Sequence, residues 1–224
     1  CFYQRKEIKD VLSYLRIIIN PSDEEALKRI INFPGRGIGQ TTIDRLIVAA
    51  NEHNKSIFEI IKHIHELPVN INAGTKTKLQ NFTIMIESFN VMSQTANAFD
   101  LAEHVCKVSG LIQEFKKDGT PEGISRMENI EELLNGIKDF VEGQQELADA
   151  SGSIAEFLED VALATDLDNE EGEDSDKKEE VPYFGKVINS SDTHMRVNVT
   201  LNDKINHIIT DPIISLHDKQ EIIS

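Results

Sequence analysis

The sequence predicts an all-α fold: a compact multi-helix subdomain with a helix–hairpin–helix element, then an acidic linker and an unassigned C-terminal segment. Two observations lead to this prediction. Apolar residues recur at helical spacing through most of residues 5–166, and breaks rich in Pro, Gly and Asn separate the periodic stretches. After residue 180 the pattern changes to the alternation of strands, as in residues 184–188 and 194–201.

The first predicted helix covers residues 5–19 and ends at Asn20 and Pro21, after which Ser22 or Asp23 can cap the next one. That second helix, over residues 23–31, has acids in its first turn, where the helix dipole favours them. A third helix follows the hairpin at Thr42. The remaining predicted helices cover residues 56–64, 75–98, 101–109 (capped by Asp100), 112–116, 124–142 and 154–166 (capped by Ser153).

The glycine-rich run between the second and third helices is the strongest candidate for a functional site. Pro34 should end the helix before it, and Ile38 should fill the gap between the two helices. Gly37 and Gly39, both expected at positive φ, leave backbone N–H groups uncovered at a helix N-terminus, which favours an anion. The expected ligand is a nucleic-acid phosphate, and the expected binding residues are Gly35, Arg36, Gly37, Ile38, Gly39, Gln40, Thr41 and Thr42. The alternative is a plain helix–helix connector whose glycines serve only the turn.

The same run is not a nucleotide-binding P-loop. Three residues, not four, separate Gly35 from Gly39, and Gln40 stands where that loop requires a lysine. Without the lysine the phosphates lack their cationic partner, so we expect no ATP binding and no cofactor in this chain.

No other pattern indicates catalysis or metal binding. Cys1 and Cys106 form no ligand set, and Cys106 is expected to be a buried helical thiol. His63 and His65 are two residues apart and face different directions on a helix, so the histidines are expected at the surface. No apolar run is long enough for a membrane span, and we expect a cytoplasmic protein.

The charge of −16 is unevenly distributed. Residues 1–50 hold 8 basic and 6 acidic residues, whereas residues 128–180 hold 3 basic and 19 acidic ones. Because salt screens charges beyond about 10 Å, the potential near the hairpin decides whether a phosphate is attracted there. The acidic half therefore does not exclude DNA, although few cations cluster at the hairpin.

Four sequence blocks, in order, resemble the 2B subdomain of UvrD/PcrA/Rep-type (superfamily 1A) DNA helicases. They are Phe2-Tyr3-Gln4-Arg5-Lys6-Glu7-Ile8-Lys9-Asp10-Val11-Leu12-Ser13-Tyr14-Leu15-Arg16, the hairpin with the preceding Asn20-Pro21-Ser22-Asp23, Ser125-Arg126-Met127-Glu128-Asn129-Ile130-Glu131-Glu132-Leu133-Leu134, and Phe157-Leu158-Glu159-Asp160-Val161-Ala162-Leu163-Ala164-Thr165-Asp166. The resemblance covers residues 2 to about 168. The resemblance favours phosphate binding by the hairpin over the alternative of a plain helix–helix connector.

The resemblance implies a function as well as a fold. In that family the 2B subdomain is an all-helical insertion in the second RecA-like motor domain; it lacks ATPase motifs, contacts duplex DNA ahead of the fork, and swivels to regulate unwinding. The chain would then be a non-catalytic regulatory part of an ATP-dependent helicase of DNA unwinding and repair, with ATP and Mg bound by the parent. Its partners would be duplex DNA and the motor domains. The alternative is a helical module that docks on protein and makes no DNA contact.

The resemblance also implies domain boundaries. We expect residues 1–168 to form the helical subdomain, 169–180 a flexible acidic linker, and 181–224 an unassigned tail. The entry near Phe2–Arg5 and the acidic exit are expected to be hinges. The family's next block, a strand with a His-containing Lys-Gly-Leu-Glu-Phe motif, is absent after Asp168, as are the upstream ATPase motifs. Since the chain also starts at Cys1, we expect a piece of a longer protein.

Overall fold

The computed structural model describes residues 2–145 and 152–170, all of which belong to one unit of the chain, Cys1–Phe184. A second unit, Gly185–Ser224, lies outside the described residues. The predictions of strand-like segments after residue 180 and of a flexible linker beyond residue 170 therefore remain predictions.

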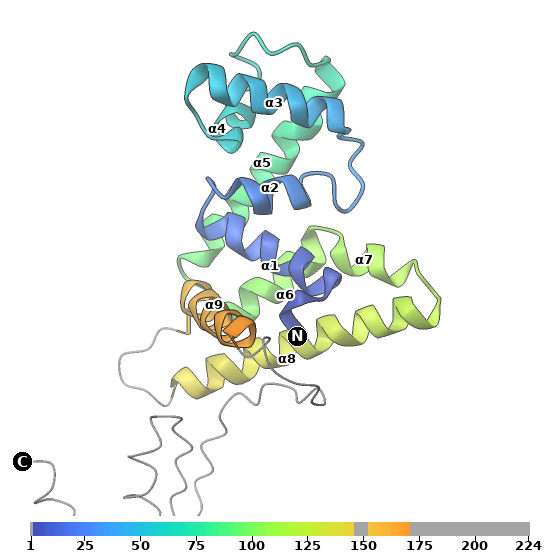
Figure 1. The fold of residues 1–224 in the computed structure, drawn as a ribbon, viewed down its shortest axis with the longest axis vertical. Coiled ribbons are helices and arrows are strands. Elements are labelled where there is room, and N and C mark those ends of the chain that lie inside the picture. The colour runs from blue at the N-terminus through green and yellow to red at the C-terminus, as the bar shows by residue number, and fades with distance from the viewer. Residues whose placement is uncertain (1, 146–151, 171–224) are drawn as a thin grey trace, which may run out of the picture. The chain divides into compact units, whose positions relative to one another are not determined.

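Every regular element of the described residues is helical, which confirms the predicted all-α class. The elements are η1 (Phe2–Gln4), α1 (Lys6–Ile19), α2 (Glu24–Ile30), α3 (Gln40–His53), α4 (Ile57–Lys62), α5 (Ala73–Ser93), α6 (Ala98–Val108), α7 (Leu111–Lys116), α8 (Pro121–Gln145) and α9 (Ile154–Glu170). Figure 1 shows α3 and α4 toward one end of this unit, α7, α8 and α9 toward the other, and α5 running between them.

Side-chain caps explain why several helices begin where they do. Asp23 accepts a hydrogen bond from the N–H of Ala26 at 3.0 Å, as expected for the cap of α2. Ser56 and Glu59 form a reciprocal capping box at the start of α4. Asn72 caps α5 by accepting from the N–H of Thr75 at 2.8 Å.

The boundary between α5 and α6 differs from the prediction. The long helix ends at Ser93 rather than at residue 98, and α6 begins at Ala98 instead of after Asp100. The start of α6 is set by Asn97, which is extended and accepts from the N–H of Asp100 at 2.9 Å. An Asn that bonds to the backbone in this way caps a helix N-terminus, so α6 begins at the next residue.

The last two helices are longer than predicted. Helix α8 begins at Pro121, inside the expected loop. Proline fits the first turn of a helix, because the N–H groups there make no bond within the helix and the N–H that proline lacks is not needed. Helix α9 continues to Glu170 instead of ending at Asp166, so it includes the first residues of the expected linker.

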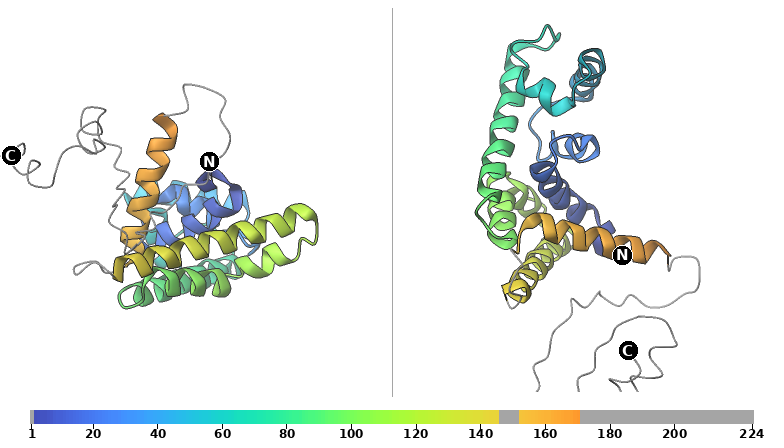
Figure 2. Two further views of the ribbon diagram at one scale, coloured as in Figure 1. Left: turned by 90° about the horizontal axis from the view of Figure 1, so that it is seen from below. Right: turned by 90° about the vertical axis from the view of Figure 1, so that its left-hand side faces the viewer.

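Helix α1 is at the centre of the core and packs against α2, α5, α6, α8 and α9. Its apolar stripe is buried, as the sequence predicts, with Ile8, Leu15 and Ile18 wholly inaccessible to solvent. Seen in Figure 2, α1 lies between α5 and the α8–α9 pair. This central helix fixes the end of α2 and, through it, the start of the hairpin.

Residues Phe2–Arg5, expected to be a weakly packed hinge, pack against the helical body instead. Tyr3 is only 4% exposed and its ring contacts that of Phe2 edge to face. The guanidinium of Arg5 donates a hydrogen bond to the side-chain oxygen of Asn129 on α8. The buried ring of Tyr3 and the hydrogen bond from Arg5 to α8 hold these residues in place, so they belong to the helical body.

Candidate functional site

The hairpin that joins α2 to α3 is built on Asn32. Its side-chain Oδ1 accepts hydrogen bonds from the N–H groups of Arg36 at 3.0 Å and Ile38 at 2.9 Å. Ile38 is 1% exposed and packs in the core between the helices, as predicted. Sequence reasoning missed Asn32, although asparagine is a residue that commonly bonds to its neighbouring backbone in turns.

The two central glycines differ in conformation. Gly37 has a φ of +71°, a left-handed conformation that favours glycine. Gly39 has a φ of −84° and a ψ of 167°, an extended conformation that any residue adopts. The expected positive φ at Gly39 is therefore wrong. Gly39 is instead the N-cap of α3, and it offers no side chain to bond the first N–H groups of that helix.

Four backbone N–H donors between Gly37 and the first turn of α3 have no acceptor among the described residues. Within the described residues, no carbonyl or side chain accepts from the N–H groups of Gly37, Gly39, Gln40 or Thr41. All four residues are exposed at the surface. The first N–H groups of a helix also carry the positive end of its dipole, so these donors form a favourable place for an anion.

A lysine from another helix lies next to these donors. The ammonium Nζ of Lys78, on α5, is 2.7 Å from the position that a Cβ at Gly37 would occupy. Lys78 is exposed, and it makes no hydrogen bond or ion pair with any residue that the structure describes. This contact joins residues 41 positions apart, so spacing along the sequence alone did not indicate it.

An acid lies near the start of α3. It is Asp44, whose carboxylate accepts from the side chain of Gln40 at 2.8 Å. Gln40 therefore offers an anion its backbone N–H, while its side chain is already bonded.

Arg36, expected to contact phosphate, has its guanidinium turned toward the protein. Its Nη2 lies 2.6 Å from the hydroxyl of Tyr14, and its Nη1 lies 3.0 Å from the carbonyl oxygen of Ile30. Of the eight expected phosphate-binding residues, five present a backbone N–H with no acceptor among the described residues: Gly35, Gly37, Gly39, Gln40 and Thr41. The N–H of Thr42 already bonds to the carbonyl of Gly39 at 3.0 Å.

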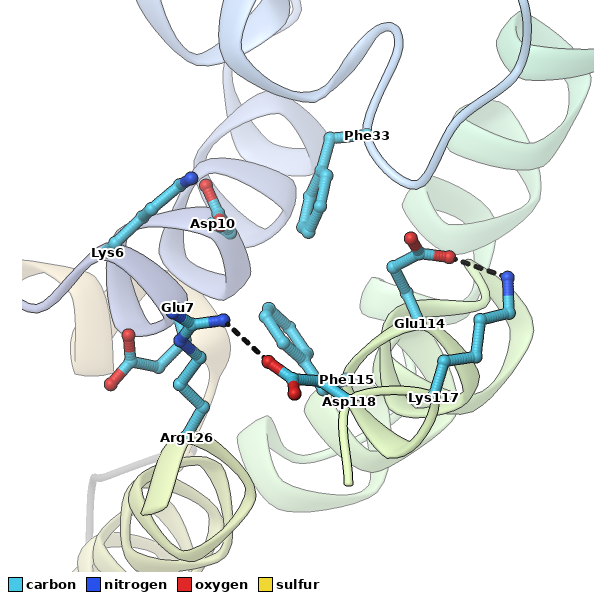
Figure 3. Close-up of a pocket in the computed structure, with 9 residues that line it drawn as sticks. All are labelled: Lys6, Glu7, Asp10, Phe33, Glu114, Phe115, Lys117, Asp118 and Arg126. Atoms are coloured by element: carbon cyan, nitrogen blue, oxygen red, sulfur yellow. Dashed lines mark hydrogen bonds and ion pairs between the residues drawn. The ribbon is translucent and has the colours of Figure 1, made fainter. Parts of the chain in front are cut away.

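A pocket of about 340 Å³ lies beside the hairpin. Phe33, at the start of the hairpin, forms part of the pocket lining. In Figure 3 the ring of Phe33 faces that of Phe115 from α7, with their centroids 5.6 Å apart. Two ion pairs border the pocket, Glu114–Lys117 at 2.8 Å and Asp118–Arg126 at 3.2 Å. Most of its charged side chains are thus paired with one another.

One carboxylate oxygen of Asp10, in this pocket, is buried without a partner in the described part of the chain. Its Oδ1 accepts from Nε of Arg29 at 2.6 Å, but its buried Oδ2 has no hydrogen-bond partner within the described residues. Burial raises the pKa of Asp10 above its usual range, against the opposing effect of the Arg29 charge.

Cys106 and the described histidines lie where the sequence placed them. Cys106 is fully buried, and burial raises the pKa of its thiol to about 12, which leaves it unreactive. His104 is exposed and its ring packs against Phe89, while His63 bonds to Glu66 at 3.0 Å. Among the described residues, no three His, Cys, Asp or Glu side chains come together in a metal-binding group. No helix in that part of the chain has the length and apolar character of a membrane span.

Comparison with known proteins identifies the family. Residues 1–184 match the model of the UvrD-like helicase C-terminal domain. The chain is 36% identical over 174 residues to the ATP-dependent DNA helicase PcrA of Leuconostoc citreum. The aligned residues make up 77% of this chain and 23% of that relative. The chain is 33% identical over 179 residues to that of Bacillus subtilis (80% and 23%), and 33% identical over 172 residues to that of Staphylococcus aureus strain Mu50 (77% and 23%). The chain thus spans about a quarter of the length of these relatives, and its extended match over residues 1–184 places it in the family of UvrD-like helicase C-terminal domains.

Proposed function

We propose that residues 2–168 are the 2B subdomain of a UvrD/PcrA/Rep-type ATP-dependent DNA helicase, and that the hairpin binds backbone phosphates of duplex DNA. The relatives are named as ATP-dependent DNA helicases, and the all-helical fold is the one that the 2B resemblance implies. In this proposal the chain regulates unwinding without catalysing it. ATP and Mg belong to the parent's motor domains, which are its second partner.

The observation that carries the proposal is the group of open donors at the hairpin. Backbone N–H groups of Gly37, Gly39, Gln40 and Thr41 lie at an uncapped helix N-terminus, and the Lys78 ammonium lies beside them. Backbone donors and a lysine bind phosphate oxygens without contacting base edges. The site should therefore hold a duplex in position and make no distinction between sequences.

The test measures duplex binding of the 224-residue chain by fluorescence anisotropy over a range of salt concentrations. Each phosphate contact made by a cation contributes about 0.9 to the slope of log affinity against log salt. Lys78→Gln should lower that slope by about one and weaken binding to different duplex sequences equally. The matched control is Lys138→Gln on α8, which removes one exposed lysine whose nearest carboxylate is that of Glu142, at 3.9 Å.

Two results would reject the proposal. One is an equal effect of Lys78→Gln and Lys138→Gln. The other is the lack of salt-dependent duplex binding, both by the chain and by an intact helicase that contains it. Binding to the motor domains without any contribution to duplex affinity would favour the protein-docking alternative instead.

A further inference from the structure

The guanidinium of Arg36 occupies the junction between the hairpin and the helical body. Its Nη1 donates to the carbonyls of Ile30 at 3.0 Å and Pro34 at 3.2 Å. Its Nη2 lies 2.6 Å from the hydroxyl of Tyr14 and 3.3 Å from the carbonyl of Ser109. These four contacts use most of the five N–H donors of a guanidinium.

The faces of the same group are covered by aromatic rings. The central carbon of the guanidinium lies 5.3 Å from the ring centroid of Phe82 on α5 and 5.9 Å from that of Tyr14 on α1. Tyr14 is fully buried, and its hydroxyl donates in turn to the carbonyl of Phe33 at 2.6 Å. Arg36 therefore links the hairpin to α1, to α5 and to the C-terminal ends of α2 and α6.

We infer that Arg36 is a positioning residue that holds the hairpin in its phosphate-binding shape, and that it is not itself a phosphate ligand. This inference rests on the proposed function. Because its donors are used within the protein, the guanidinium has little left to offer a phosphate. Its removal would release Pro34 and the following turn from the body, so that Gly37 would lose its place beside Lys78.

The chemistry of arginine makes this role testable. A planar guanidinium can bond several carbonyls in different directions and stack on rings, whereas lysine has a compact ammonium on a flexible stem. Arg36→Lys keeps the positive charge but loses this geometry. Arg36→Gln loses both, so the pair of variants separates the charge from the position.

The experiment compares these two variants with the unaltered chain in the salt series described above. A positioning role predicts that both variants weaken duplex binding by about tenfold (roughly 1.4 kcal/mol), with the salt slope unchanged. If Arg36 contacted phosphate directly, Arg36→Lys would bind nearly as the unaltered chain does, and Arg36→Gln would lower the slope by about one. Either of these last two results would overturn the inference.

A second measurement does not depend on DNA. Amide hydrogen exchange of Ile38 should become at least about tenfold faster in Arg36→Lys, while Leu133 in α8, a buried reference position, exchanges at its original rate. Unchanged exchange at Ile38 would overturn the positioning role. If neither the unaltered chain nor an intact helicase that contains it binds duplex, the proposed function fails, but the exchange comparison still decides what Arg36 does.

A milder variant covers the case in which substitution of Arg36 unfolds the chain. Tyr14→Phe removes only the hydroxyl that links Arg36 to the carbonyl of Phe33. It should speed exchange at Ile38 and weaken duplex binding in the same direction, by a smaller factor. A Tyr14→Phe chain with both quantities unchanged would contradict the inference.

Discussion

The hairpin and the neighbouring pocket, which share Phe33, use their polar groups in opposite ways. In the hairpin the side chains of Asn32 and Arg36 bond inward, while backbone N–H groups and Lys78 remain open. In the pocket the carboxylates of Glu114 and Asp118 are paired with nearby cations. The pocket holds more charge, whereas the hairpin presents open backbone N–H donors.

If the proposed function holds, the difference teaches that net charge alone does not locate the phosphate site in this chain. The net charge is −16, and the excess acid lies away from the hairpin in the sequence. A phosphate is attracted by donors that are free and close together, and the hairpin supplies these from its backbone. Substitutions in the pocket should therefore change stability, whereas substitutions in the hairpin should change binding.

The largest effect on stability is expected for Arg29→Met. This change removes the partner of the Asp10 carboxylate and a hydrogen bond from Arg29 Nη2 to the carbonyl of Lys6 at 2.9 Å. A buried charge left without a partner is costly, although the partial exposure of Arg29 reduces the effect. We expect the free energy of unfolding at pH 7 to fall by about 2 kcal/mol in urea titrations.

Asp10→Asn is the matched control. Its amide oxygen can still accept from Arg29, and no charge is left buried, so the loss should be below about 1 kcal/mol. Duplex binding should be unchanged in both variants. An equal loss of stability in the two would mean that the ion pair itself, rather than the burial of an unpaired carboxylate, dominates this part of the molecule.

The helical body was well predicted from the sequence, because apolar periodicity and caps such as Asp23 are local signals. Errors occurred where a single asparagine or proline decided a boundary, as at Asn97 and Pro121. The site was predicted only in part. The glycine-rich turn is visible in sequence, but the contact of Lys78 with the hairpin depends on how α5 packs, which periodicity does not specify.

An intermediate effect is expected for Gly37→Val. The left-handed φ of +71° strains any β-branched residue, and its Cβ would lie 2.7 Å from Nζ of Lys78. We expect unfolding free energy to fall by about 1–2 kcal/mol and duplex affinity to fall by at least about tenfold, as measured by thermal melts and anisotropy. The control is Gly39→Ala, because Gly39 is extended and an added Cβ meets nothing within 4 Å.

The outcome of this pair bears directly on the comparison of the two regions. Gly39→Ala should keep the stability of the unaltered chain to within about 0.5 kcal/mol. If Gly37→Val lost stability but bound duplex normally, the turn would serve only the fold. The hairpin would then resemble the pocket in having a structural role and no role in binding.

Helix propensity and capping cannot explain why Arg36, predicted to bind phosphate, turns inward. The reason is tertiary: carbonyls at the ends of α2 and α6 and two aromatic rings meet at one point, and a guanidinium satisfies all of them. None of these partners except Ile30 and Pro34 is near Arg36 in sequence. Such a convergence can be recognised only after the helices are packed.

The smallest expected effect is a pH dependence caused by Asp10. Its pKa is raised in the folded chain, mainly by burial, so the folded state keeps this proton after the unfolded state has lost it. The contribution of Asp10 to stability is therefore full below the unfolded pKa of about 3.9 and is lost as pH rises through the folded value. The unfolding free energy of the unaltered chain minus that of Asp10→Asn isolates this group from other carboxylates, and it should decrease as pH rises through this range in urea titrations. An increase instead would mean that the attraction of Arg29 outweighs burial, and that this pocket carboxylate is as fully committed as Glu114 and Asp118.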